Sequence, residues 1–221
     1  MASASSLALV ICFSMLWASS DGHGRLLHPV CRASMWRIGK YHTPRDFTDN
    51  QLYCGGLTHQ KRMGGKCGIC GDPYDQRPPR AHEIGGAKFV KSAIIVEKYS
   101  KGAIINAKVQ LTANHLGYFE FSICPVHGMA AEATQECLDR HRLQVVGTGS
   151  TRYPISGGMR MVIVPLQLPA SVTCKHCVFQ WKYTAGNNWG YCSKSGKHRR
   201  IGRIGCGPQE HFFGCADIAI F

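Results

Sequence analysis

The stretch AIINAKVQLT, residues 103–112, decides the fold class of this chain. Its apolar residues Ile105, Ala107, Val109 and Leu111 alternate with polar ones, which is the period of a strand with one buried face. Further strand candidates are 93–99, 119–123, 160–164, 179–183 and 217–221. Several short strands separated by turn residues, with no long amphipathic helix, predict an all-β fold, an immunoglobulin- or fibronectin-III-like antiparallel β-sandwich.

The segment from His23 to about Glu83 shows neither the strand period nor the helix period. The pairs Gly55-Gly56, Gly64-Gly65 and Pro78-Pro79 interrupt it and are strong turn signals. We therefore expect long loops and short helical turns here, pinned by disulfides. No internal repeat or linker separates this segment from the strands, so residues 23–221 are expected to form one domain.

The first 22 residues have the pattern of a leader. Leu7 to Ala18 are apolar apart from Ser14 and carry no charge. The run ends in small residues and is shorter than the roughly 20 apolar residues of a membrane span. No Lys or Arg precedes it, which departs from the usual pattern. The sequence predicts a secretory signal peptide over residues 1–22, cleaved after Gly22, so that a secreted, extracellular chain without a membrane partner begins at His23.

Cysteine content agrees with secretion. The chain has 12 cysteines, and all but Cys12 remain after removal of the leader, a density typical of a disulfide framework. That remainder is odd, so at least one thiol is free, capped or in an intermolecular bond. Two Cys-x-x-Cys pairs, Cys67/Cys70 and Cys174/Cys177, also allow structural zinc, but they lie too far apart for a zinc ribbon and secretion favours disulfides.

Basic residues give the chain a formal net charge of +13 at pH 7, and removal of Asp21 with the leader raises it by one. Weak nonspecific binding to polyanions is expected from this charge. The basic stretch 194–203 could contact nucleic acid or acidic glycans, but a solvated loop is the simpler interpretation, so no specific nucleic-acid partner is expected.

Two histidines stand out as candidate metal ligands. Cleavage in front of His23 would place a free amine and an imidazole on one residue, and the two groups can chelate a metal together. His115 follows the strand candidate 103–112 in a turn at one end of the expected sandwich, where its side chain could face solvent. Three nitrogen donors leave coordination positions open and suit copper(II) better than zinc. We therefore expect a copper site formed by His23 and His115.

An ordered set of short motifs runs from His23 to Phe221. It comprises HGRL at 23–26, WR at 36–37, CGG at 54–56, CGICGD at 67–72, TANH at 112–115, CKHCV at 174–178 with QW at 180–181, GNNWG at 186–190, and CGPQE at 206–210 with CAD at 215–217. In this order the set resembles the lytic polysaccharide monooxygenases of auxiliary activity family fifteen. These are secreted copper enzymes of arthropods and other eukaryotes, including ferns, where a relative is an insecticidal chitin-binding protein.

The resemblance implies roles for individual residues. The family's histidine brace corresponds to the amine and ring of His23 and the ring of His115, and the small residue beside one axial face corresponds to Ala113. The axial aromatic residue corresponds to Phe212, where many members have tyrosine. Glu210 matches a polar residue that could hydrogen-bond an oxygen co-substrate at the metal. The simpler interpretation of Phe212 is an ordinary core aromatic residue, and that of Glu210 is a solvated carboxylate.

The implied reaction is oxidative cleavage of crystalline polysaccharide, chitin before cellulose, by abstraction of hydrogen from C1 or C4. It needs one copper ion, an external electron donor, and dioxygen or hydrogen peroxide as co-substrate. Tyr41 and Tyr118 are candidates for contact with the polysaccharide surface, and a monomer is expected. The alternative is a non-catalytic chitin-binding defence protein with the same fold. Cys31 departs from the ten-cysteine pattern of the family and is the candidate for the odd thiol.

Overall fold

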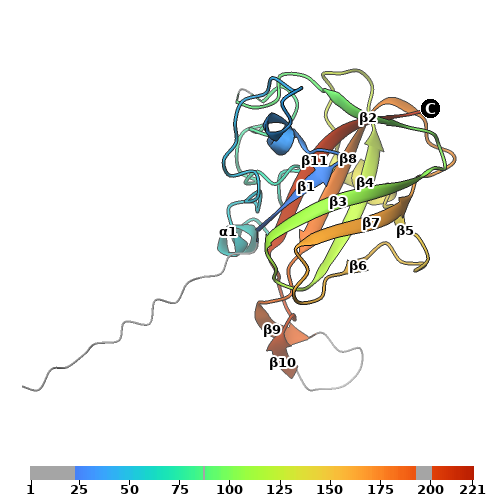
Figure 1. Ribbon diagram of the computed structural model, residues 1–221. Coiled ribbons are helices and arrows are strands. Elements are labelled where there is room, and N and C mark those ends of the chain that lie inside the picture. The colour runs from blue at the N-terminus through green and yellow to red at the C-terminus, as the bar shows by residue number, and fades with distance from the viewer. Residues whose placement is uncertain (1–22, 87, 193–200) are drawn as a thin grey trace, which may run out of the picture.

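Two β-sheets packed face to face form the core of the computed structural model, which describes residues 23–86, 88–192 and 201–221 (Figure 1). The first sheet has the strand order β1-β3-β7-β5 and the second has the order β2-β11-β8-β4-β6. The first sheet consists of β1 His23–His28, β3 Ile104–Ala113, β5 Gln144–Val145 and β7 Met161–Gln167. The second consists of β2 Ile95–Tyr99, β4 Tyr118–Pro125, β6 Tyr153–Pro154, β8 Cys174–Thr184 and β11 His211–Ile220. The predicted β-sandwich is confirmed.

The direction of one strand pair differs from the sequence prediction. Paired neighbours are antiparallel throughout the described strands except for β2 and β11, which are parallel with Ile95 opposite Asp217. Alternation of apolar residues marks a strand and its buried face, but it carries no information about the direction of the partner. The second sheet is therefore mixed at this edge, where only antiparallel pairing was expected.

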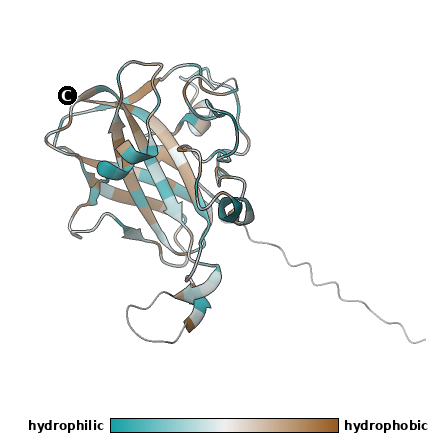
Figure 2. Cartoon of the chain, turned by 180° about the vertical axis from the view of Figure 1, so that it is seen from behind, coloured by the Kyte–Doolittle hydropathy of each residue, from teal (hydrophilic) through white to brown (hydrophobic). Residues whose placement is uncertain are grey.

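Alternating residues fill the space between the two sheets with large apolar side chains. Ala107 and Val109 of β3 are fully buried. Opposite them, the ring of Phe119 packs edge-on against Trp181 at 5.4 Å and against Tyr183 at 5.1 Å. Figure 2 shows hydrophobic residues along the strands of the sandwich, whereas the short helices α1 (Leu57–Arg62) and α2 (Gln135–Arg140) are mostly hydrophilic. The packed aromatic core holds the ends of the strands in fixed positions.

The N-terminal segment is mostly loop with short helical turns, as predicted, but the strand formed by its first residues was not expected. His23–His28 form β1, which pairs with β3 and has irregular register near both of its ends. These irregularities leave only Gly24 and Leu26 buried, too few to give a readable period. The 3-10 helix η1, Arg32–Arg37, and helix α1 follow within the loops.

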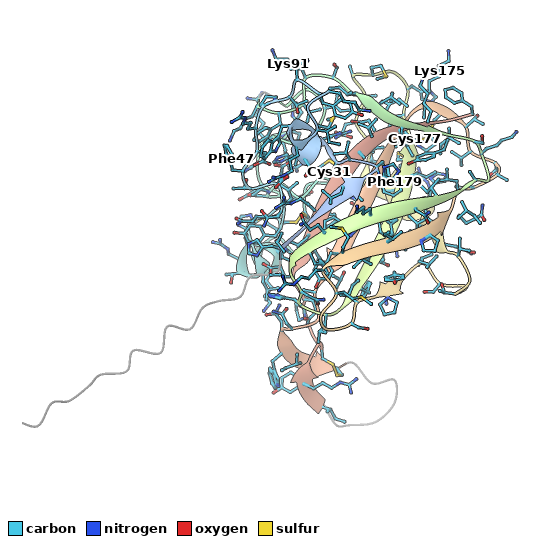
Figure 3. The ribbon with its side chains drawn as sticks, viewed as in Figure 1. Cys31, Phe47, Lys91, Lys175, Cys177 and Phe179 are labelled. Atoms are coloured by element: carbon cyan, nitrogen blue, oxygen red, sulfur yellow. A yellow bond between two sulfur atoms is a disulfide. The ribbon has the colours of Figure 1, made fainter. Side chains whose placement is uncertain are left out.

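Disulfides pin these loops to the sandwich. The pairs are Cys54–Cys67, Cys70–Cys215, Cys124–Cys137, Cys174–Cys177 and Cys192–Cys206. Cys67 and Cys70 bond to different partners, so the described chain uses its cysteines as a framework and not as zinc ligands. Cys31 is the free cysteine of the described residues and is buried beside η1 (Figure 3). This confirms the prediction that Cys31 is the unpaired cysteine. The leader, residues 1–22, lies outside the described residues.

A buried histidine joins three parts of the N-terminal loops. The Nε2 of His82 lies 3.0 Å from a carboxylate oxygen of Asp46, and its Nδ1 lies 2.8 Å from one of Asp72. The ring also stacks on Phe89 at 4.7 Å. Burial opposes a charge on this ring, but the hydrogen bonds to the two carboxylates outweigh it and raise the pKa of His82 to about 9. His82 is therefore an imidazolium that holds two carboxylates together at neutral pH.

Candidate metal centre

Strand pairing brings the two predicted ligands to the same end of the sandwich. His23 begins β1 and lies opposite Ala113, the last residue of β3. His115 follows Ala113 by two residues, so the start of β1 and the turn after β3 are neighbours. The Gly24 N–H donates to the carbonyl oxygen of Asn50 at 3.0 Å, and the Asn50 side chain donates to Thr112 Oγ1 at 3.0 Å. This asparagine fastens the first residues of β1 to the end of β3.

His115 is more enclosed than its position in a turn suggested. The sequence placed its side chain toward solvent, but only 6% of the residue is exposed. Its main-chain N–H donates to the Tyr183 hydroxyl at 2.9 Å, and that hydroxyl donates to the Leu116 carbonyl oxygen at 2.7 Å. Burial raises the pKa of Tyr183 to about 12, so the hydroxyl stays protonated and keeps donating. The hydroxyl of the core residue Tyr183 thus holds the backbone of this turn in place.

Two glycines let a second loop approach this turn at backbone distance. Gly117 has a φ of +84°, and a Cβ built on it would lie 2.0 Å from the carbonyl oxygen of Thr184. A Cβ built on Gly186 would lie 2.8 Å from the Gly117 nitrogen. The Gly186 N–H donates to the His115 carbonyl oxygen at 2.8 Å. Any side chain at these two positions would push the loops apart.

The close approach places an amide on His115 that sequence reasoning missed. The Asn187 side-chain nitrogen lies 2.7 Å from Nδ1 of His115. This contact engages Nδ1 of the ring, so the orientation of the amide decides which ring nitrogen carries the proton. Asn187 belongs to the motif GNNWG, but a motif match alone does not say which ring an amide will meet.

Phe212 forms an apolar wall beside His23. Its ring centroid lies 6.4 Å from that of His23, with the planes inclined by 46°. Phe212 is fully buried, stacks on Tyr53 at 5.9 Å and contacts Tyr183 at 5.7 Å. The structure therefore brings Phe212, His23 and, through Tyr183, the His115 turn into one contiguous group. The position lacks a hydroxyl that could bind the metal.

Glu210 lies just before β11, next to the same group, and is 7% exposed. One of its carboxylate oxygens accepts a hydrogen bond from the Leu57 N–H at 3.2 Å, at the start of α1. Its main-chain oxygen accepts from the Ala185 N–H at 3.0 Å. The side chain is thus neither a solvated carboxylate nor a distant one. Its bond to Leu57 holds the carboxylate at the start of α1.

The donor set at this end fits a copper ion better than a hard cation. No group of three or more His, Cys, Asp or Glu side chains suited to a metal occurs within the described ranges. The candidate donors are the rings of His23 and His115 and the main-chain nitrogen of His23, and nitrogen donors suit copper. The nitrogen of His23 can serve as a ligand only when no residue precedes it. A metal site here therefore depends on cleavage before His23.

An exposed pair of aromatic rings lies next to the site along the chain. Trp189 and Tyr191 are 60% and 52% exposed, and their rings meet edge to face at 5.0 Å. They belong to β9 (Trp189–Cys192), which pairs with β10 (Ile201–Ile204) in a hairpin that projects from the sandwich (Figure 1).

Tyr41 and Tyr118, which were proposed from the sequence as surface contacts, are less exposed than Trp189 and Tyr191. Tyr41 and Tyr118 are partly buried, and a guanidinium group of Arg152 covers the Tyr118 ring at 4.4 Å. Neither composition nor period distinguished Trp189 from a core tryptophan, which is why the hairpin was missed. The basic stretch 194–203 falls mostly outside the described residues, and its last three residues belong to β10.

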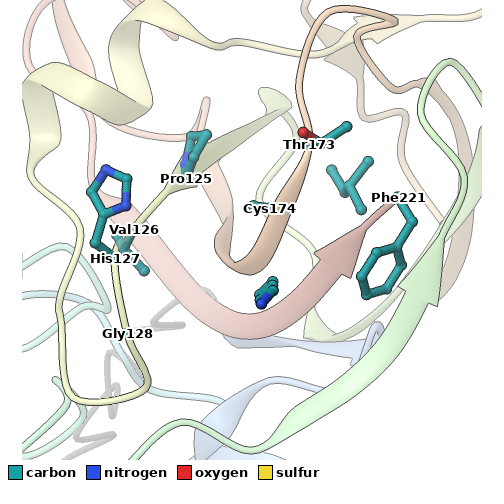
Figure 4. Close-up of a pocket in the computed structure, with 9 residues that line it drawn as sticks. Pro125, Val126, His127, Gly128, Thr173, Cys174 and Phe221 are labelled. Carbon is teal, nitrogen blue, oxygen red and sulfur yellow. The ribbon is translucent and has the colours of Figure 1, made fainter.

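A pocket of about 500 Å³ lies at the opposite end of the sandwich (Figure 4). Pro125 at the end of β4, Cys174 at the start of β8 and Ile220 at the end of β11 line it. These strands run from the His115 end to the pocket or back, so the pocket is a full strand length away. It is not part of the candidate metal centre.

Comparison with known proteins gave two matches. A family model described as "Lytic polysaccharide mono-oxygenase, cellulose-degrading" matches residues 23–218. A solved structure, lytic polysaccharide monooxygenase AA15 from Thermobia domestica in the Cu(I) state, is 40% identical, with a TM-score of 0.82 over 90% of this chain and 98% of that chain. No curated protein sequence matches significantly. No helix within the described residues is long and apolar enough to cross a membrane.

Proposed function

Since the chain belongs to auxiliary activity family fifteen of the lytic polysaccharide monooxygenases, and is thus a copper-dependent polysaccharide monooxygenase, we propose that it is secreted and cleaves crystalline chitin oxidatively. Cellulose is proposed as a second substrate, because the matching family model is described as cellulose-degrading. The observation that carries the proposal is the pairing of His23 with Ala113, two residues before His115.

The proposed ligands are the amine and ring of His23 and the ring of His115. Removal of residues 1–22 would expose the amine of His23, so the site can form only after that cleavage. Asn50 holds the start of β1, and the Tyr183 hydroxyl holds the His115 turn. Because these contacts come from groups other than the proposed ligand atoms, they position the ligands.

A copper ion bound there would supply one-electron chemistry with an external donor and with dioxygen or hydrogen peroxide as co-substrate. With dioxygen, two electrons and two protons are consumed: one oxygen atom enters a C–H bond at C1 or C4, and the other leaves as water. With hydrogen peroxide, the oxygen atom and the electrons come from the peroxide itself. A hydroxylated C1 or C4 then expels the neighbouring sugar, which breaks the chain.

Residues around the ligands have separate proposed tasks. Phe212 excludes water from one side of the site and offers no hydroxyl of its own. Glu210 is held by the Leu57 N–H, and we propose that its second carboxylate oxygen orients the oxygen co-substrate. Ala113 keeps the other side open, since a larger side chain opposite His23 would narrow the approach.

Trp189 and Tyr191 are proposed to contact the polysaccharide. Aromatic rings stack on the apolar faces of sugar rings, whereas the positive charge of this chain gives no attraction for neutral chitin. The hairpin begins two residues after Asn187, which contacts His115, so a polysaccharide bound on the aromatic pair lies near the metal ligands.

The test is incubation of copper-loaded protein with β-chitin, and separately with crystalline cellulose, in the presence of a reductant. Soluble oligosaccharides with oxidised ends, released only when copper and reductant are both present, are the expected result. Mass spectrometry distinguishes C1 from C4 products. Products identical to those of hydrolysis, or release without reductant, would refute the proposal. Chitin binding without oxidised products, even with peroxide supplied, would favour the non-catalytic defence protein.

A further inference from the structure

Asn187 contacts the His115 ring at the edge that carries Nδ1. Its amide nitrogen is 2.7 Å from Nδ1. Asn187 itself is exposed, whereas His115 is 6% exposed, so the amide contacts a ring whose remaining surroundings are largely protein. Neither the brace nor the substrate surface described above requires this contact.

The chemistry of imidazole gives the contact a consequence. A neutral ring carries one proton, and the nitrogen that lacks it is the one that can bind a metal. If the Asn187 nitrogen donates to Nδ1, the proton sits on Nε2 and that nitrogen cannot be a ligand. If the amide is rotated by half a turn, its oxygen accepts from Nδ1–H and Nε2 keeps its lone pair. Within the described part of the chain, the Asn187 side chain has no second hydrogen bond that opposes this rotation.

The backbone fixes the distance between the two side chains. Gly117 and Gly186 bring their loops into direct contact, and the Gly186 N–H donates to the His115 carbonyl oxygen. On the other side of Asn187, the Asn188 N–H donates to the Gln209 side-chain oxygen at 3.0 Å, and the Gln209 amide donates back to the Asn188 carbonyl at 3.0 Å. The backbone on both sides of Asn187 is thus held in place.

We propose that Asn187 is a positioning residue whose side-chain carbonyl accepts the Nδ1–H of His115 and so leaves Nε2 as the metal-binding nitrogen. This inference rests on the proposed function, because it assigns His115 as a ligand. Outer hydrogen bonds of this kind orient ligand histidines and select their tautomer, and their loss typically lowers metal affinity about 10- to 100-fold.

The test compares three variants. Asn187→Asp retains an acceptor and removes the donor, Asn187→Ala removes both, and Asn188→Ala removes an amide one residue away as the matched control. The tautomer of His115 is read in metal-free, ¹⁵N-labelled protein by long-range ¹H–¹⁵N NMR at a pH where the ring is neutral. Its signals are assigned by their loss in His115→Ala. Copper(II) affinity is measured separately by competition with a chelator.

The expected result is a proton on Nδ1 in the wild type, in Asn187→Asp and in Asn188→Ala. In Asn187→Ala the Nε2–H form should gain population and copper affinity should fall about 10- to 100-fold. A proton on Nε2 in the wild type would overturn the proposal, and so would an Asp variant that behaves like the Ala variant. If the wild type binds no copper, the proposed function fails, while the tautomers still decide the role of Asn187.

Discussion

Raising the pH from about 6 to about 10 should weaken the fold through His82 alone by about 3 kcal/mol. Its pKa is about 9 in the folded chain, against the ordinary histidine value of 6.5 that applies when the chain is unfolded. Because the folded pKa is the higher one, the stabilisation is fully present below about pH 6.5 and is lost as the pH rises through about 9. Each pKa unit of that difference is worth about 1.4 kcal/mol.

The measurement is the free energy of unfolding in guanidinium chloride at both pH values, with disulfides intact. Every protein carries Cys31→Ser, so that no free thiol can exchange with disulfides in the unfolded chain. His82→Gln should be less stable than the reference at pH 6 and should lose about 3 kcal/mol less on going to pH 10. Replacement of the exposed His42 by Gln is the matched control and should leave the dependence unchanged. Equal pH dependence in the reference and His82→Gln would refute the reasoning about Asp46 and Asp72.

Three further outcomes are expected. A protein with one extra residue before His23 should lose most of its copper affinity, because its amine can no longer close a chelate ring with the imidazole; equal affinity in isothermal titration calorimetry would exclude the brace. His115→Ala should abolish release of oxidised oligosaccharides and, since the ring is buried, lower the free energy of unfolding by about 1–2 kcal/mol; retained activity would mean that another histidine is the ligand. Trp189→Ala should reduce adsorption to β-chitin severalfold in a pull-down assay, while Phe47→Ala, which removes a ring that is 73% exposed elsewhere on the surface, should not; equal losses would argue against the hairpin as the binding surface.

Strand periodicity predicted the sandwich well because β3 and β7 bury one regular face. By contrast, β4, β8 and β11 are buried on both faces and were marked by their alternating large apolar side chains or by short apolar runs. The alternation in 103–112 became β3 almost residue for residue. β1 was missed because its pairing with β3 is irregular near both ends, and a short strand with a bulge shows no period. The hairpin β9–β10 was missed for a different reason, since its side chains are largely exposed and no buried face marks it.

The two candidate ligands could be proposed from the sequence, but their surroundings could not. His23 was marked by the leader, and His115 by its place after a strand, both of which are local signals. The burial of His115 and its contacts with Tyr183 and Asn187 join residues about 70 positions apart, which no single-sequence period encodes. The position of Glu210 against α1 likewise depends on where the Cys70–Cys215 disulfide and the loops carry that helix.

The place of β11 between the edge strand β2 and the rest of the second sheet affects the order in which that sheet can form. β11 lies between β2 and β8, yet it is the last of the described strands to leave the ribosome. The edge strand β2 cannot join β8, β4 and β6 in this sheet until residues 211–220 have been synthesised, and Phe212 and Cys215 arrive with them. Long-range pairing of this kind is slow to form. Only the second sheet, and the contacts of Phe212 with His23 and Tyr183, therefore wait for β11 to emerge.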